Sequence, residues 1–232
     1  RTDTIMIASI NNETKKVNLV SVYRDTMLKQ NGEHYDKANA AYSVGGAETA
    51  VNMLNENLDL DIQDYVSVNF LALADVIDMI DGITVKMTDE EVVHMNNYCV
   101  ETSKVTGKSY EKIKPEVAGT YKLNGVQAVS YARIRYTAGG DYKRTERQRL
   151  VLEKTVNKLK KQNFTTINKI VDKVMPEVST SFTTKEILAL AAGMFDYELG
   201  ETTGFPFDLE TPEKISGYSG SYVIAKGLEE NV

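Results

Sequence analysis

Short β-rich runs alternate with segments of helical periodicity along the whole chain, and no Pro-, Gly- or Ser-rich linker divides them. The runs Ile5–Ile10 and Lys15–Val22 flank the turn-forming sequence NNETKK and predict a hairpin. Helical spacing of apolar residues follows in Tyr42–Leu60 and Leu71–Gly82. This alternation predicts an α/β fold: a mixed central β-sheet flanked by helices, an α/β/α sandwich, in a single domain over residues 1–232.

Capping and turn residues predict further elements. They are a strand at 83–87, a helix from 88 to about 98, a short helix at 123–132, helices at 142–162 and 183–197, and an edge strand at 221–224. Thr88 and Glu91 have the spacing of a capping box, and Asn124 is a suitable N-cap for the short helix. Residues 101–120 are polar, include Pro115, and predict an exposed, irregular excursion.

Composition excludes several classes of protein. The net charge of −6 and the pI of about 5.1 give no support to an extended nucleic-acid-binding face, although a local pocket for a small anion is compatible with them. The single cysteine, Cys99, rules out an intrachain disulfide. No apolar run approaches the length of a membrane span. The first residues already have strand character, so we expect a trimmed chain whose membrane anchor has been removed.

The distribution of arginine is the most informative chemical signal. The chain has seven arginines, and five of them fall within residues 131–149. If the backbone at Arg133 and Arg135 is extended, both side chains leave the same face about 7 Å apart. Guanidinium groups at that separation suit two neighbouring phosphoryl groups, because each can donate two parallel hydrogen bonds to phosphate oxygens.

The segment AGGDYKRTERQ, directly after this pair, predicts the start of a helix. Asp141 is a suitable cap, and Arg144 and Gln148 lie one turn apart on the same face. The backbone N–H groups of a first helical turn also favour an anion. The alternative is a basic first turn that forms only surface salt bridges. Arg147 and Arg149 point elsewhere and suit structural or solvated positions.

Two upstream segments supply carboxylates. Arg24 and Asp25 follow directly after a predicted strand, where α/β folds place ligand-contacting side chains, although a simple strand-end salt bridge is the alternative. Asp3 precedes the first strand and is a candidate Mg²⁺ ligand, because Mg²⁺ combines a few carboxylates with phosphate and water. One aspartate alone does not establish a metal site.

Other chemistries lack their residues. The sequence contains no zinc-ligand spacing, no catalytic triad, no P-loop and no G-x-S-x-G elbow. Arginines with carboxylates suit phosphoryl transfer, in which positioning and charge stabilisation provide most of the catalysis.

Six segments in order resemble successive motifs of the LytR-CpsA-Psr (LCP) family, over residues 1 to about 152. They are RTDTIMIASIN, KKVNLVSVYRDT, DKANAAYSVGG, LADVIDMIDGITV, LNGVQAVSYARIRY and GGDYKRTERQRLVL. The resemblance implies a bacterial envelope enzyme anchored by an N-terminal helix, with its catalytic domain on the extracellular face of the membrane. Such enzymes transfer a glycan phosphate from a polyprenyl-pyrophosphate carrier to peptidoglycan, and their products include wall teichoic acid and capsule.

The resemblance also implies roles for individual residues. An apolar pocket takes the polyprenyl tail, while arginines and Mg²⁺ hold the pyrophosphate. Asp3 matches the metal-binding aspartate. The implied catalytic residues are Arg24, Asp25, Arg133, Arg135 and Asp141, and the implied substrate-binding residues are Arg1, Lys37, Arg144 and Gln148. Family members usually carry a further strand before Arg1 with another metal-binding aspartate, so the chain is expected to lack one metal ligand.

Two other functions remain open at this point. The same arginines would serve a pyrophosphatase that acts on the same kind of lipid with water as the nucleophile. They would also serve a non-enzymatic regulatory module of the envelope that binds an anionic glycopolymer or lipid. The pairing of carboxylates with arginines favours the transferase. The sequence does not choose between Asp25 and Asp141 as the group that orients the attacking hydroxyl or accepts its proton.

Overall fold

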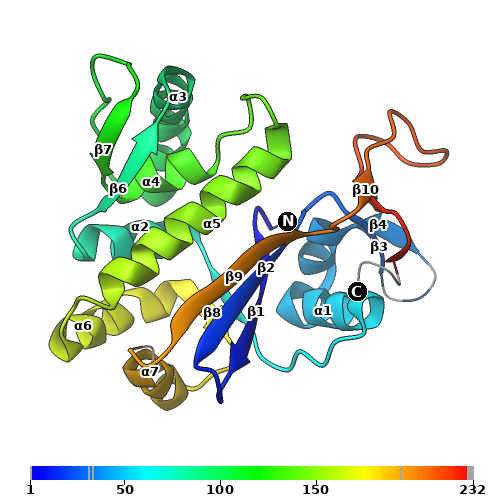
Figure 1. Ribbon diagram of the computed structural model, residues 1–232, viewed down its shortest axis with the longest axis horizontal. Coiled ribbons are helices and arrows are strands. Elements are labelled where there is room, and N and C mark those ends of the chain that lie inside the picture. Colours follow the sequence, from blue (N-terminus) through cyan, green and yellow to red (C-terminus); the bar gives the residue numbers. More distant parts are fainter. Residues whose placement is uncertain (1, 31, 33, 194, 229–232) are drawn as a thin grey trace. The chain divides into compact units, whose positions relative to one another are not determined.

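A computed structural model describes residues 2–30, 32, 34–193 and 195–228 of the chain (Figure 1). The chain forms two compact units. The first combines Arg1–Tyr65 with Glu198–Val232, and the second is the continuous segment Val66–Tyr197. No helix in these described stretches is long and apolar enough to cross a membrane.

A mixed three-stranded sheet forms the centre of the first unit. Strands β1 (Ile5–Asn11) and β2 (Lys16–Val22) pair in antiparallel fashion, which confirms the predicted hairpin. Asn11 closes their turn, because its side chain accepts the N–H groups of residues 13 and 14. Strand β9 (Glu198–Phe205) pairs in parallel with the other edge of β2, so that β2 is central (Figure 1).

Short elements complete the first unit. They are β3 (Met27–Lys29), β4 (Tyr35–Lys37), η1 (Ala38–Ala40), α1 (Ala41–Leu58), β10 (Leu209–Glu210) and β11 (Ile224–Ala225). The predicted helix at 42–60 is confirmed as α1, but Gly45 and Gly46 lie inside it and break its helical geometry, with φ of +71° at Gly46. The expected edge strand at 221–224 is found as β11, shifted toward the C-terminus. Val22, Leu28, Met53 and Phe205 pack in the core of this unit.

The second unit is mostly helical. Its helices are α2 (Phe70–Met79), α3 (Asp89–Thr106), α4 (Gly125–Ala132), α5 (Gly140–Leu159), α6 (Phe164–Val174), η2 (Met175–Glu177) and α7 (Thr184–Gly193). Its strands form two antiparallel pairs, β5 (Val66–Val68) with β8 (Val178–Thr180) and β6 (Ile83–Met87) with β7 (Gly119–Leu123). Every residue of α4 is buried, so this helix is the centre of the unit.

The caps of α3 and α4 explain where these helices begin. Thr88 with Glu91, and Asn124 with Gln127, both form complete capping boxes. Helix α3 continues well past the predicted end near residue 98. It ends at Thr106, where Gly107 takes a left-handed conformation (φ 68°) as the C-cap. The irregular excursion is therefore shorter than expected, and its last residues form β7. The α/β class with a mixed sheet is confirmed.

Candidate phosphate-binding site

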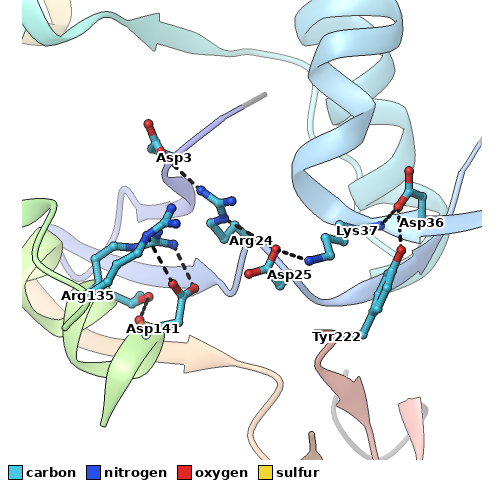
Figure 2. Close-up of polar contacts among 10 residues, drawn as sticks. Asp3, Arg24, Asp25, Asp36, Lys37, Arg135, Asp141 and Tyr222 are labelled. Carbon is cyan, nitrogen blue, oxygen red and sulfur yellow. Dashed lines mark hydrogen bonds and ion pairs between the residues drawn. The ribbon is translucent and has the colours of Figure 1, made fainter. Parts of the chain in front are cut away.

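In the first unit, the segment after β2 carries a network of ion pairs, which we call the Arg24 network: Asp3, Arg24, Asp25 and Lys37. Arg24 Nη1 donates to Asp3 Oδ1 at 2.9 Å, and Arg24 Nε lies 3.6 Å from Asp25 Oδ1. Lys37 Nζ, at the end of β4, lies 3.0 Å from the same Asp25 oxygen (Figure 2). The structure thus brings together these four predicted residues.

Residues near the C-terminus hold this network in place. The ring of Tyr222 lies under Lys37, with Nζ 4.9 Å from its centroid, and its hydroxyl donates to Asp36 Oδ1 at 3.2 Å (Figure 2). The N–H of Val223 donates to the Asp25 carbonyl at 2.9 Å. Sequence reasoning missed Tyr222, since no local pattern connects it with residues almost two hundred positions earlier.

Asn39 is a second residue that the sequence did not single out. It lies in η1, and its N–H donates to the Arg24 carbonyl at 3.0 Å. The residue is fully buried, and its side-chain amide makes no hydrogen bond within the described part of the chain. Buried amides nearly always have a partner, so Asn39 is a candidate polar contact beside Arg24. The sequence signal for Asn39 was its place in the family-like segment DKANAAYSVGG.

The charges of the Arg24 network bear on the Mg²⁺ prediction. Asp25 is enclosed by two cations, whereas the Asp3 side chain is 43% exposed and remains accessible. Nowhere in the described stretches do three or more His, Cys, Asp or Glu side chains gather into a metal site. Mg²⁺ commonly binds through one or two carboxylates plus phosphate oxygens and water, and Asp3 suits that mode. The metal ligand at Asp3 stays a prediction.

In the second unit, Arg133 is fixed by its neighbours. Its guanidinium carbon lies 4.7 Å from the ring centroid of Phe70 and 5.6 Å from that of Tyr98. Nη1 donates to Thr102 Oγ1 and Nη2 pairs with Glu101 Oε1, both at 3.0 Å. The extended backbone considered for this position is not found, because Arg133 is the helical C-cap of α4 (φ −93°, ψ −9°).

Helix α5 and the loop before it provide what we call the Asp141 network: Arg135 from the loop, and Asp141 and Arg144 from the helix. Asp141 Oδ2 lies 2.9 Å from Arg144 Nη2. Figure 2 shows the other pair, in which Asp141 Oδ1 lies 3.9 Å from Arg135 Nε. Arg144 is only 2% exposed. The prediction that Asp141 caps this helix is wrong. Gly139 takes the N-cap position with a φ of 88°, and Asp141 lies in the first turn. Gln148 is half-buried one turn beyond Arg144.

Arg147 has a structural role, in agreement with the interpretation from the sequence. It is buried, its Nε pairs with Glu91 at 2.9 Å, and its other nitrogens donate to the Ile134 carbonyl and to Thr137 Oγ1. These bonds fix the loop between α4 and α5, on which Arg133 and Arg135 lie. Burial, with the charge of Glu91, raises the pKa of the nearby Tyr131 to about 12.

Two observations limit the site. The prediction for Arg1 falls outside the described residues. A pocket of about 650 Å³ in the second unit contains none of the predicted residues; it is lined by Asp78, Asp81, Gly82, Ser109, Tyr110, Glu111, Lys122, Leu123, Asn124 and Gln127. Its polar groups are largely engaged with one another, as in the ion pair of Lys122 with Asp81.

Known proteins are similar to this chain in both sequence and fold. Residues 1–204 match the model of the LytR_cpsA_psr family. The chain is 34% identical over 165 residues to Biofilm regulatory protein A of Streptococcus mutans, covering 68% of this chain and 38% of that protein. It is 36% identical over 161 residues to the polyisoprenyl-teichoic acid–peptidoglycan teichoic acid transferase TagU of Enterococcus faecalis, covering 68% and 47%. The chain thus spans less than half the length of either relative.

Solved structures extend the similarity to nearly the whole chain. A transcriptional regulator from Enterococcus faecalis superimposes with a TM-score of 0.75 at 28% identity, covering 97% of this chain and 77% of that one. Bacillus subtilis TagT shares the fold with a TM-score of 0.73 at 23% identity, covering 99% and 82%. The family match covers most of the chain and includes the motifs that carry Arg24, Arg133 and Arg144. The chain therefore belongs to the LytR_cpsA_psr family.

Proposed function

We propose that this chain is the catalytic part of a phosphotransferase that joins a glycopolymer, through its phosphate, to peptidoglycan. The donor would be a glycan carried on polyprenyl pyrophosphate. Relatives named as teichoic acid transferases support the reaction class. The observation that carries the proposal is the fixed guanidinium of Arg133, which lies two residues before the Asp141 network and is oriented before any substrate binds.

The proposed reaction is a displacement at phosphorus. A hydroxyl oxygen of peptidoglycan attacks the glycan-bearing phosphorus, the bond from that phosphorus to the bridging oxygen breaks, and polyprenyl phosphate leaves. Arg133, Arg135 and Arg144 bind phosphate oxygens and stabilise the charge that develops on the leaving group. Gln148 adds a hydrogen bond, and Asp25 or Asp141 orients the attacking hydroxyl or accepts its proton.

The Arg24 network has a separate role in this proposal. Arg24 and Lys37 are both held against Asp25, so a phosphate oxygen can contact them without a large rearrangement of either cation. We assign Arg1 to the same anion-binding function. Asp3 would hold Mg²⁺, which when bound neutralises negative charge on phosphate oxygens.

The proposed substrates also define the cellular location. Polyprenyl-linked glycan is bound to the membrane and peptidoglycan lies outside it, so we place the reaction on the extracellular face of the bacterial cell membrane. An anchoring segment outside the present sequence would keep the enzyme there. The acidic chain has no expected nucleic-acid partner.

Replacement of the arginines tests the proposal. In the full-length protein, Arg133→Ala and Arg135→Ala are each expected to lower the rate of glycan transfer by about 100-fold, because each removes a phosphate contact in the transition state. Lys143→Ala is the matched control, since this exposed cation lies in the first turns of α5, shortly after the two arginines in sequence, and forms its described ion pair with Glu146. Transfer at the wild-type rate by the arginine variants would contradict the assignment.

Two alternatives predict different products. A pyrophosphatase would release free glycan phosphate when no acceptor is present, whereas the transferase requires peptidoglycan. A regulatory module would bind the lipid or glycopolymer without any product, and the names of some relatives, such as Regulatory protein MsrR of Staphylococcus aureus, keep this possibility in view. A product assay with and without acceptor distinguishes all three.

A further inference from the structure

A group of three aromatic rings, one of them exposed and two half-buried, lies beside Arg133. Tyr136, in the loop between α4 and α5, is 73% exposed. Its ring lies 6.4 Å from that of Tyr98 at an angle of 22° and 6.2 Å from that of His94 at 38°, measured between centroids. His94 and Tyr98 are one turn apart on α3. We call these three rings the aromatic platform.

Charged groups border the aromatic platform along α3. Glu90 lies one turn before His94, with its carboxylate 3.8 Å from Nε2, and Glu101 lies about one turn after Tyr98. Both carboxylates are exposed. Arg133 contacts the Tyr98 ring and pairs with Glu101. The platform is therefore a small aromatic surface, most exposed at Tyr136, with hydrogen-bonding groups at its edges.

This combination limits what can bind there. Single exposed aromatic residues are common, but three neighbouring rings next to a candidate site indicate an interaction surface. A lipid chain or an apolar protein face would remove water from the exposed carboxylates of Glu90 and Glu101 and offer them no hydrogen bond in return, which is costly. A pyranose ring has an apolar C–H face and a rim of hydroxyl groups, so it can stack on the rings while carboxylate and guanidinium groups bond its hydroxyls.

We propose that the aromatic platform binds a pyranose ring of a glycan substrate and contributes to the choice of glycan. The inference rests on the proposed function, in which Arg133 contacts a phosphate, because the platform adjoins that guanidinium through Tyr98. Burial, with the neighbouring Tyr136, raises the pKa of the Tyr98 phenol, so its hydroxyl stays protonated and can donate to a sugar oxygen. The sugar belongs either to the donor or to the peptidoglycan acceptor.

The absence of tryptophan from the sequence permits a direct binding test. Tyr136→Trp keeps an aromatic ring in the platform and makes it the sole indole reporter. Phe164→Trp, at the half-exposed first position of α6, is the matched control. Titration with chitotetraose, a soluble N-acetylhexosamine oligosaccharide, is expected to shift the emission of the Tyr136→Trp protein to shorter wavelength with saturation. The control should not respond.

Kinetics of the full-length protein identify the source of the sugar. Tyr136→Ala is expected to raise KM about tenfold for one substrate with little change in kcat, whereas Tyr136→Phe should resemble the wild type. A raised KM for peptidoglycan assigns the platform to the acceptor, and a raised KM for the lipid-linked donor assigns it to the donor glycan.

Specific results would overturn the proposal. They are an unchanged Tyr136→Trp emission at millimolar chitotetraose together with unchanged kinetics of Tyr136→Ala, or an emission that responds to polyprenyl phosphate micelles and not to the oligosaccharide. Saccharide binding by a protein that transfers no glycan would support the platform and reject the proposed function. Normal transfer with an unaffected Tyr136→Ala variant would reject the platform alone.

Discussion

Each neighbour of Arg133 uses a different property of guanidinium. Phe70 and Tyr98 contact its flat faces, Thr102 accepts a hydrogen bond at its edge, and Glu101 offsets its charge. The sequence indicated that this arginine was important, but the reason for its fixed position was not visible there. Phe70 and Tyr98 lie far from it in sequence, and only the packing of α2, α3 and α4 makes them neighbours.

Lysine is therefore a poor substitute at this position. Arg133→Lys is expected to lower kcat/KM for transfer by at least about tenfold, because an ammonium group lacks the planar faces and the fixed pair of parallel donors. Arg135→Lys should have a smaller effect, since Arg135 is 39% exposed and lies 3.9 Å from Asp141. Steady-state kinetics with a lipid-linked donor compare the two variants. A larger loss of kcat/KM in Arg135→Lys than in Arg133→Lys would contradict the prediction.

The raised pKa of Tyr131 predicts how the free energy of unfolding changes at alkaline pH. Its pKa is raised from 10.0 to about 12 by burial and by Glu91. Because the folded pKa is raised, the stabilisation is complete below pH 10 and is lost as the pH rises through about 12. Over this range the wild type should lose up to about 3 kcal/mol more free energy of unfolding than Tyr131→Phe.

Urea denaturation of both proteins at a series of alkaline pH values measures this difference. If the wild type and Tyr131→Phe lost the same free energy of unfolding as the pH rises, Tyr131 would not titrate as expected. The spectrophotometric titration offers a second check, since the variant should lack one phenol that ionises late.

The secondary-structure elements differ in how well the sequence predicts them. The boxes at Thr88 and Asn124 located the starts of α3 and α4 because capping depends on residues within one turn. Helix α6 was overlooked, although Ile167, Ile170 and Val171 lie on one face and Asn163 caps it. Strand β9 could not be read in the same way. Its sequence ELGETTGF has little β-propensity, and its conformation comes from pairing with β2.

Glu91 connects the start of α3 to α5, which gives an element-scale prediction. One carboxylate oxygen accepts the Thr88 N–H, and the other pairs with buried Arg147. Glu91→Ala is expected to destabilise the protein by about 3–5 kcal/mol, because it leaves a buried cation without its carboxylate. Thr88→Ala removes only the cap and should cost about 1 kcal/mol.

Thermal and urea unfolding of the two variants provide the comparison. Glu91→Gln is the control that keeps a cap acceptor while removing the charge. If Glu91→Ala were no less stable than Thr88→Ala, the ion pair with Arg147 would contribute nothing to the structure.

At the scale of the whole molecule, the two units differ in how the chain builds them. The second unit is one continuous segment, whereas the first joins the N-terminal residues to those after Tyr197. The family resemblance supplied most candidate site residues of both units, since motifs are local, and their roles stay predictions. It did not reveal Tyr222, which lies beyond the residues that match the family model. The prediction of a single catalytic domain over residues 1–232 stays a prediction.

Truncation tests this difference between the units. A chain ending at Tyr197 lacks β9 and Phe205, so β2 loses one neighbour and the core of the first unit loses a buried ring. Hydrogen exchange is expected to show unprotected amides in β1 and β2, while those of α3, α4 and α5 stay protected. Equal protection of β1 and β2 in the truncated and full chains would contradict the dependence on β9.

The pairing of β2 with β9 also sets the order in which the protein can mature. Lys16 is synthesised some 180 positions before its partner Glu198. During that interval the hairpin has an unsatisfied edge, while the second unit has all of its own residues and can fold first. Tyr23, next to Arg24, donates its N–H to the Phe205 carbonyl, and Lys37 packs on the Tyr222 ring, so these supports form only after residues 205 and 222 have been synthesised. A polypeptide that ends at Tyr197 would therefore hold a finished Arg133 environment without a finished Arg24 network, so activity would require the residues that follow the second unit.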